Sequence, residues 1–166
     1  MRTDKNRYFL DLALRAAQQG TCLRRNFGAI IVEPAGNLEI TIGYTGSPIG
    51  TPNCCDKGWC LRNKLNIPSG QSYEKCFSVH AEMNALLKAG AKAYGCVIYV
   101  IGFDVVTKEL VEGKPCFLCT KMLINAGIQD VITLSKDRQR VYALSTRNLF
   151  ENYSLELEKE MLDTKK

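Results

Sequence analysis

The one histidine in the chain, His80, stands two residues before Glu82. Farther along, the motif Pro-Cys-Phe-Leu-Cys places Cys116 and Cys119 three residues apart. One imidazole and two thiolates supply three ligands for a zinc ion and leave the fourth position of a tetrahedral site open for water, as catalytic zinc requires. These residue types therefore predict a catalytic zinc held by His80, Cys116 and Cys119.

The spacing of the two cysteines supports the same site. A separation of three residues puts both sulfurs on one side of a helix when they lie in its first turn. The free N–H groups and the dipole at a helix N-terminus stabilise thiolates. Pro115 suits that position because its missing N–H is not needed there. We therefore expect a helix to begin at about residue 116.

Glu82 follows His80 too closely to bind the same ion easily, so it can point into a substrate pocket. His-x-Glu followed by Pro-Cys-x-x-Cys is the signature of zinc deaminases, in which the glutamate moves protons and does not bind the metal. Glu82 would take a proton from the attacking water, deliver it to N3 of a cytosine ring and assist the departure of ammonia. The N–H of Ala81, or of a neighbour at this helix start, is the expected donor to the carbonyl of the base.

The elements that must position these residues follow from the apolar patterns. Helices are expected at about residues 5–19, 80–89 and 116–126, and strands at 27–33, 38–44, 96–102 and 130–134. Alternating helices and strands predict an α/β sandwich. The last segment, at about residues 137–166, is expected to be helical, with a few leucines as its apolar markers.

Length and composition limit the function classes. A chain of 166 residues favours a single domain over residues 1–166. No apolar run is long enough for a membrane-spanning helix, and the N-terminus lacks the pattern of a secretory signal, so we expect a cytoplasmic protein with no membrane partner. The net charge of +5 suits anionic ligands such as nucleotides. No run of five or more basic residues indicates a nucleic-acid arm.

A cysteine-rich insertion at about residues 45–79 breaks the alternation of helices and strands. A structureless loop of that length is unusual in a compact domain, so something should pin it. The chain has eight cysteines and no secretory signal, which favours metal binding over disulfides. The favoured ligands of a second, structural zinc are Cys22, Cys54, Cys60 and Cys76. Cys55 is the alternative to Cys54, and reduced thiols in a mobile loop are the alternative to the whole site.

Several stretches carry a family likeness. They are T-C-L-R-R-N-F-G-A-I-I-V (21–32), G-Y-T-G-S-P-I-G (43–50), N-C-C-D (53–56), H-A-E-M-N-A-L (80–86) and P-C-F-L-C (115–119). Through them the chain resembles the deoxycytidylate deaminases over about residues 8–134. The resemblance implies a cytidine-deaminase-like three-layer sandwich, with a mixed five-stranded sheet flanked by helices. It also implies conversion of deoxycytidylate (dCMP) to dUMP for thymidylate synthesis, one catalytic zinc, and homo-oligomers that are often hexamers.

The same resemblance implies roles for individual residues. Asn84 and Asn26 match positions that are candidates for nucleotide contact. Several phage members of the family hold a second zinc partly through cysteines that match Cys22 and Cys54, which supports the structural zinc site inferred from the insertion.

The chain departs from the family pattern at two points. Thr45 replaces the asparagine of G-Y-N-G, and Ala91 stands where regulated members have an arginine. In those members dCTP activates the enzyme and dTTP inhibits it. The departures predict that the enzyme is active without an activator. The alternative is that it is regulated by a nucleotide triphosphate effector bound with Mg²⁺.

Other functions stay open on the sequence. Such a deaminase could act on dCTP, on another cytosine nucleotide, or on a flipped base in a polynucleotide. The polynucleotide substrate is disfavoured: it calls for a basic groove with stacking aromatics, whereas Arg24, Arg25, Arg62 and Lys64 serve a single phosphate just as well. A non-catalytic, zinc-stabilised binding module is a third class, which the presence of Glu82 disfavours.

Overall fold

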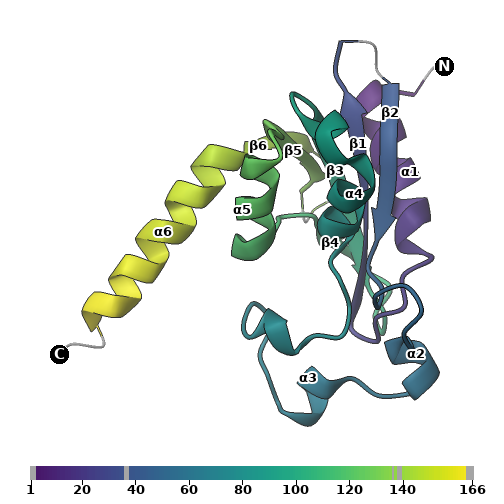
Figure 1. Cartoon of the computed structure of the whole chain (residues 1–166), viewed down its shortest axis with the longest axis vertical. Helices are drawn as coiled ribbons and strands as arrows, with labels where there is room; N and C mark the ends of the chain where they lie inside the picture. Colours follow the sequence, from purple (N-terminus) through teal and green to yellow (C-terminus); the bar gives the residue numbers. More distant parts are fainter. Residues whose placement is uncertain (1–2, 36–37, 136, 138–139, 164–166) are drawn as a thin grey trace.

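One mixed β-sheet lies between helices in this protein (Figure 1). The computed structural model describes residues 3–35, 38–135, 137 and 140–163. The strands are β1 (Arg25–Glu33), β2 (Leu38–Tyr44), β3 (Val97–Asp104), β4 (Leu110–Glu112), β5 (Asp130–Leu134) and β6 (Val141–Ser145). The main helices are α1 (Lys5–Ala17), α4 (Ala81–Ala89), α5 (Phe117–Asn125) and α6 (Thr146–Asp163), and two short ones are α2 (Cys54–Lys57) and α3 (Leu61–Lys64). Within these ranges no helix is both long and apolar enough to cross a lipid bilayer.

The strands follow the order β2-β1-β3-β5-β6, and β4 pairs with β3 beside this path. β1 pairs antiparallel with both β2 and β3, whereas β3 and β5 are parallel. Parallel neighbours need a long crossover connection, and α5 lies in the segment that joins β3 to β5. The predicted mixed sheet is therefore confirmed, and α5, which begins directly after Cys116, lies in this crossover.

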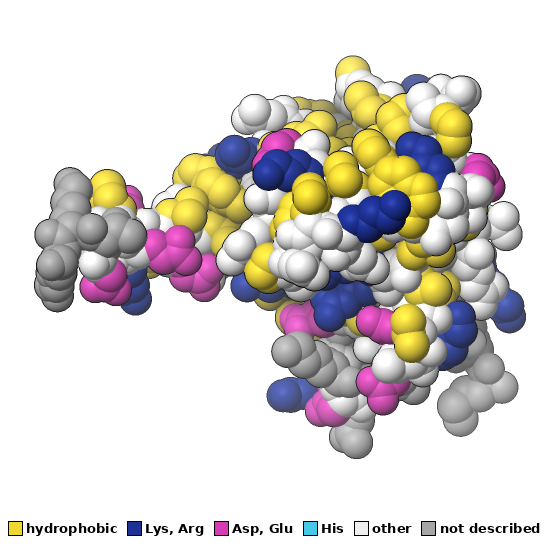
Figure 2. Space-filling view, turned by 90° about the horizontal axis from the view of Figure 1, so that it is seen from below, with side chains coloured by type: hydrophobic (Ala, Val, Ile, Leu, Met, Phe, Trp, Pro, Cys, Tyr) yellow, Lys and Arg dark blue, Asp and Glu magenta, His cyan; other side chains and the backbone are white. Residues whose placement is uncertain are grey.

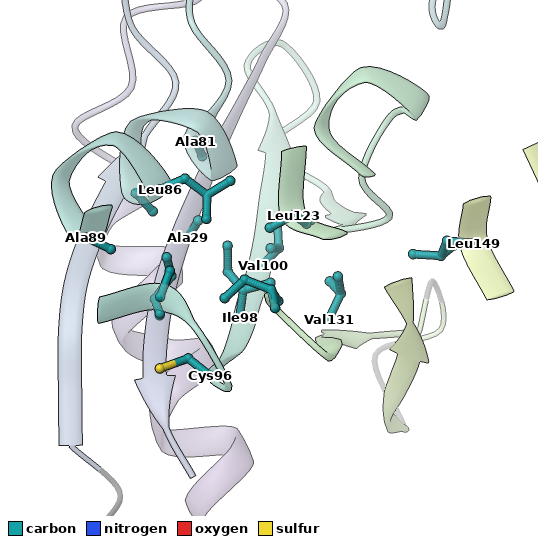
Figure 3. Close-up of a cluster of buried hydrophobic side chains, with 14 residues drawn as sticks. Ala29, Ala81, Leu86, Ala89, Cys96, Ile98, Val100, Leu123, Val131 and Leu149 are labelled. Atoms are coloured by element: carbon teal, nitrogen blue, oxygen red, sulfur yellow. The ribbon is translucent and has the colours of Figure 1, made fainter. Parts of the chain in front are cut away.

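Helices cover both faces of the sheet, which makes three layers. Along β1, Ile30 and Val32 pack toward Phe9 and other residues of α1. Ala29 and Ile31 point the other way, into a second cluster with α4 and α5. Figure 3 shows that second cluster, where side chains from both helices meet those from β1, β3 and β5. The predicted three-layer sandwich is confirmed, and the helices that begin at the predicted metal ligands share one face of the sheet.

Two predictions about the sheet and its C-terminal end were wrong. The described residues form six strands in the sheet, not five, because the short β4 and β6 both pair in it. The segment after residue 137 does not begin as a helix: Val141–Ser145 pairs antiparallel with β5, which covers an edge that would otherwise expose unpaired backbone groups. The helix begins only at Thr146, whose hydroxyl donates to the carbonyls of Ile128 and Gln129. Residues 164–166 lie outside the described residues.

The insertion is closed at its base by an isolated bridge between Gly46 and Val79. It contains α2, α3 and a 3₁₀ turn at Tyr73–Lys75. Arg62 lies buried at its centre, and its Nη2 donates to the carbonyls of Pro68 at 2.7 Å and Gln71 at 2.6 Å. Polar contacts of this kind hold the insertion in place, together with packing between the rings of Trp59 and Phe77, whose centroids lie 5.8 Å apart.

Candidate active site

The first ligand group lies at the start of α4. His80 is the N-cap residue of this helix, in an extended conformation that turns the chain into it. The helix lies close to β2 because Gly43 has no side chain: a Cβ there would clash with the backbone of Ala81 and Ala85. A glycine in the strand therefore sets how near His80 and Glu82 can come to the sheet.

The second ligand group lies at the start of α5, as the Pro-Cys-x-x-Cys motif predicted. Cys116 is the N-cap residue. Its carbonyl accepts hydrogen bonds from the backbone N–H of Thr120 at 2.9 Å and from the Thr120 hydroxyl at 3.0 Å. Cys119, one turn into the helix, is fully buried. The first turn of α5 thus fixes both sulfurs.

The two helix starts bring His80, Cys116 and Cys119 together, which we call the catalytic cluster. Nδ1 of His80 lies 3.5 Å from Sγ of Cys116 and 3.4 Å from Sγ of Cys119. Zinc bonds of about 2.3 Å to sulfur and 2.0 Å to nitrogen at tetrahedral angles place those atoms about 3.5 Å apart. In the described part of the chain, no other group of three or more His, Cys, Asp or Glu side chains has all its ligand atoms within 4.8 Å of one another. The donor set and its dimensions fit zinc.

The ionisation of this cluster also suits a metal. Hydrogen bonding to Cys119 and contact with His80 together lower the pKa of the Cys116 thiol to about 4, against the effect of burial. The same contact and burial raise the pKa of Cys119, so this thiol holds its proton more tightly than Cys116 does. Burial lowers the pKa of His80, but the hydrogen bond to Cys116 and the charge of Glu82 outweigh it and raise the pKa overall. A divalent cation would displace both protons.

Glu82 lies beside the cluster without belonging to it. Its side chain is only 6% exposed. Burial raises the pKa of this carboxyl, and His80 lowers it in part. A buried carboxyl whose pKa is raised toward neutrality can both accept and return a proton, as general acid–base catalysis requires.

A cavity of about 510 Å³ opens over the cluster. His80, Glu82 and Cys116 line it together with basic side chains from several elements, namely Arg24, Arg25, Arg62, Lys75 and Lys114. Tyr153, Glu156, Leu157 and Glu160 of α6 form another wall. This volume lies within the range of about 300–1,000 Å³ that is typical of small-molecule sites. The cavity therefore has room for a small anionic ligand beside the catalytic cluster.

Comparison with known proteins agrees with this geometry. Residues 3–135 match the model of the cytidine and deoxycytidylate deaminase zinc-binding region. The chain belongs to this family.

Individual relatives share about a third of their aligned residues with the chain. Deoxycytidylate deaminase of Mycobacterium phage D29 is 33% identical over 137 residues, which cover 79% of this chain and 94% of the relative. Deoxycytidylate deaminase of Schizosaccharomyces pombe is 32% identical over 127 residues, but these cover 75% of this chain and only 35% of that longer protein. A crystal structure of dCMP deaminase from cyanophage S-TIM5 in complex with dCMP and dUMP is 26% identical, with a TM-score of 0.52, covering 79% of this chain and 81% of the phage chain.

Two side chains near His80 were not predicted from the sequence as its neighbours. The ring of Tyr73, from the insertion, meets the His80 ring edge to face with centroids 4.7 Å apart. The Arg62 guanidinium lies over the same Tyr73 ring, with its Cζ 4.6 Å from the ring centroid. No spacing rule links residues 62 and 73 to residue 80, because only the fold of the insertion brings them together.

The predicted substrate contacts have different outcomes. Ala81 is the first residue of α4, and the first N–H groups of a helix have no partners inside it. Its N–H is therefore available as a donor to the base carbonyl, a role that stays a prediction. The Asn84 side chain donates to the Tyr44 carbonyl at 2.8 Å. Asn26 accepts from the Cys22 N–H and donates to the Gly20 carbonyl, both at 3.0 Å. Neither asparagine is among the residues that line the cavity, so their nucleotide contacts stay predictions.

The cysteines predicted for the second zinc lie along the same cavity. Cys22, Cys54, Cys60 and Cys76 all line it, and we call them the insertion cluster. Burial raises the pKa of the Cys54 thiol, and the charges of the other three raise it further, which reflects their proximity. Cys55, by contrast, is exposed, with its sulfur 3.6 Å from Asp56. This placement favours Cys54 over Cys55 as a member of the cluster.

Proposed function

We propose that this protein deaminates dCMP to dUMP and ammonia and so supplies dUMP for thymidylate synthesis. The observation that carries the proposal is the catalytic cluster, with ligand atoms that all lie within 4.8 Å of one another and a buried Glu82 beside them. The deoxycytidylate deaminases among the relatives and the phage enzyme crystallised with dCMP and dUMP support this substrate.

The geometry supports a division of labour between metal and carboxyl. Zinc in the cluster would act as a Lewis acid and make a water molecule acidic at neutral pH. Glu82 accepts the proton of the attacking water and delivers it to N3 of the cytosine. An oxygen–carbon bond forms at C4, the bond from C4 to the exocyclic nitrogen breaks, and ammonia leaves with the transferred protons. Burial of Glu82 supports this role, because it raises the pKa of the carboxyl that must return the proton.

The charge of the cavity supports a phosphorylated substrate over a free nucleoside. Five Lys or Arg side chains line the cavity beside four Glu side chains. Of the basic ones, Arg24 precedes β1, Arg25 is its first residue and Arg62 lies in α3. Arginine binds phosphate through paired N–H groups. Figure 2 shows Lys and Arg side chains scattered among hydrophobic, acidic and uncharged ones on the face seen there, which suits one phosphate better than a continuous polynucleotide backbone.

The deciding experiment is the initial rate of ammonia release from zinc-loaded protein with dCMP, first alone and then with dCTP and Mg²⁺. We expect rapid turnover of dCMP alone, since Ala91 stands where regulated members have an arginine. Glu82→Gln should retain zinc and lose about 10³-fold in kcat. Turnover only after dCTP is added would keep the reaction and overturn the lack of regulation. Activity on dCTP, deoxycytidine or a cytosine oligonucleotide but not on dCMP would overturn the substrate.

We also propose a second zinc held by the insertion cluster. Support comes from the four thiols that line one cavity and from the absence of a disulfide among the eight cysteines, which fits a reducing, cytoplasmic setting. Metal analysis should give two zinc ions per chain in the wild type and one in Cys60→Ala. One zinc in both proteins would contradict the second site.

Assembly into a homo-oligomer, such as the hexamers of the family, is a further proposal. The distal half of α6 extends away from the sheet (Figure 1) and exposes Leu155 and Leu162. An isolated helix of this length gains most of its stability from packing. Light scattering on the purified chain should give a mass that is a multiple of one chain's mass, and a monomer at micromolar concentration would contradict the proposal.

A further inference from the structure

The loop that carries Cys116 is held from two sides. On one side, the N–H of Gly113 donates to Oγ1 of Thr133 in β5 at 2.8 Å, and Gly113 has no room for a Cβ against the backbone of β3. On the other side, the hydroxyl of Tyr153 in α6 donates to the carbonyl of Pro115 at 2.7 Å. The sheet and the C-terminal helix therefore both fix the residues just before the zinc ligand.

The hydrogen bond from Tyr153 satisfies a buried backbone carbonyl of the loop. Pro115 is fully buried, so its carbonyl has little access to water and needs a donor from the protein. A buried carbonyl left without a partner costs about 1–3 kcal/mol. The same carbonyl belongs to the peptide that leads into Cys116, so a change in its direction would rotate the sulfur ligand.

Several contacts keep the Tyr153 hydroxyl in place. Its ring packs against Phe117, with centroids 5.6 Å apart, and Phe117 packs in turn against Phe150. Nζ of Lys114 lies 4.9 Å from the centroid of the Tyr153 ring. Burial, together with the charge of Cys116, raises the pKa of the Tyr153 hydroxyl to about 12, so the group stays protonated as a donor. The inner half of α6 is therefore part of the site, although its outer half extends away from the sheet (Figure 1).

We infer that Tyr153 is a positioning residue of the zinc site: its hydrogen bond to Pro115 orients the peptide before Cys116 and thereby sets how tightly the ion is held. The inference rests on the proposed zinc-dependent function. Groups that orient metal ligands from outside the ligand set typically change metal affinity or activity by about 10–100-fold when they are removed. Tyr153 contacts the backbone before Cys116 and not the ligand side chain itself. Its effect should therefore lie near the lower end of that range.

The test compares two substitutions that each remove one tyrosine hydroxyl. Tyr153→Phe removes the hydrogen bond to Pro115 and keeps the ring packing. Tyr99→Phe is the matched control, because its hydroxyl donates to Oδ1 of Asn6 at 2.8 Å and its ring packs in the cluster on the α1 face of the sheet. Release of zinc to a chromogenic chelator is followed in both variants, and the phase missing from Cys116→Ser identifies the catalytic site. Cobalt-substituted protein gives the ligand geometry from its visible spectrum.

We expect Tyr153→Phe to release this zinc about tenfold faster than the wild type, to shift the cobalt spectrum, and to lower kcat for dCMP while KM is unchanged. Tyr99→Phe should release zinc at the wild-type rate, even if its melting temperature falls by as much as that of Tyr153→Phe. Equal release from Tyr153→Phe and wild type, or equal acceleration in both variants, would overturn the inference. If the wild type deaminates dCMP and Tyr153→Phe releases zinc normally, the function stands and only the role of Tyr153 fails. A wild type that neither binds zinc nor deaminates dCMP would overturn both.

Discussion

The catalytic cluster and the insertion cluster line one cavity, but they rest on different kinds of structure. The catalytic ligands lie at the starts of α4 and α5, which pack on the sheet through a core of fully buried side chains. The cysteines of the insertion cluster lie on a short helix and in loops, held by polar contacts such as those of Arg62. In the described residues only the catalytic cluster has its ligand atoms within 4.8 Å of one another.

The difference shows what the fold alone can preorganise. Helices anchored to a sheet place their first turns whether or not a metal is bound, because apolar burial fixes them. A segment without a core of its own depends on a metal to bring its ligands together, as small zinc domains do. We therefore expect metal at the catalytic cluster to serve chemistry and metal at the insertion cluster to serve stability.

The largest effect separates the two clusters by activity. Cys119→Ala should abolish turnover of dCMP, with a loss of at least about 10³-fold in kcat, because an incomplete ligand set cannot hold the catalytic ion. Cys60→Ala should keep measurable turnover and lower the melting temperature instead. Both values come from ammonia release and from a thermal scan on the same samples. Equal loss of turnover in the two variants would contradict separate roles for the two clusters.

Removal of metal should act mainly on the insertion. After chelation, amide hydrogens of residues 45–79 should exchange at least about tenfold faster, because local opening follows the loss of contacts that hold the segment. Amides of α4 and α5 that face the core should keep their protection. Hydrogen exchange read by mass spectrometry measures both regions at once. Fast exchange in α4 as well would contradict a preformed catalytic cluster.

Two adjacent cysteines offer a matched pair within the insertion. Cys54→Ser should destabilise the zinc-loaded protein by about 1–3 kcal/mol, because it alters a buried member of the cluster. Cys55→Ser changes an exposed thiol and should stay within about 0.5 kcal/mol of the wild type. Urea unfolding of the two variants measures the difference. The reverse order would make Cys55 the ligand.

The smallest effect concerns the cap of α2. Hydrogen bonds from the backbone and side chain of Asn53 lower the pKa of the exposed Asp56 carboxyl below its usual value of 3.8. A lowered folded-state pKa gives stability that is present above the unfolded pKa and is lost as pH falls through the folded one. Asp56→Asn should therefore lower the melting temperature slightly at pH 7 and leave it unchanged at a pH well below the folded-state pKa. An equal difference at both pH values would mean that the charge is irrelevant.

Sequence patterns were informative where the chemistry is local. The order of His-x-Glu and Pro-Cys-x-x-Cys indicated the catalytic cluster, because each motif opens a helix that the apolar pattern had predicted. The same patterns missed β6, since Val141–Ser145 is a short half-buried strand whose existence depends on pairing with β5. The family resemblance added Asn26 and Asn84 as candidates for nucleotide contact. These roles stay predictions, and in the structure both side chains hydrogen-bond to the protein itself.

By itself the sequence determined the class of fold, the candidate ligand set and the carboxyl beside it, because these follow from residue types at fixed short spacings. The tertiary structure decided which distant side chains complete the site. Tyr73 reaches His80 through the path of the insertion, and Tyr153 reaches Pro115 through the packing of α6 on α5. Contacts between residues far apart along the chain depend on how whole elements bury their apolar faces, and no local spacing encodes that arrangement.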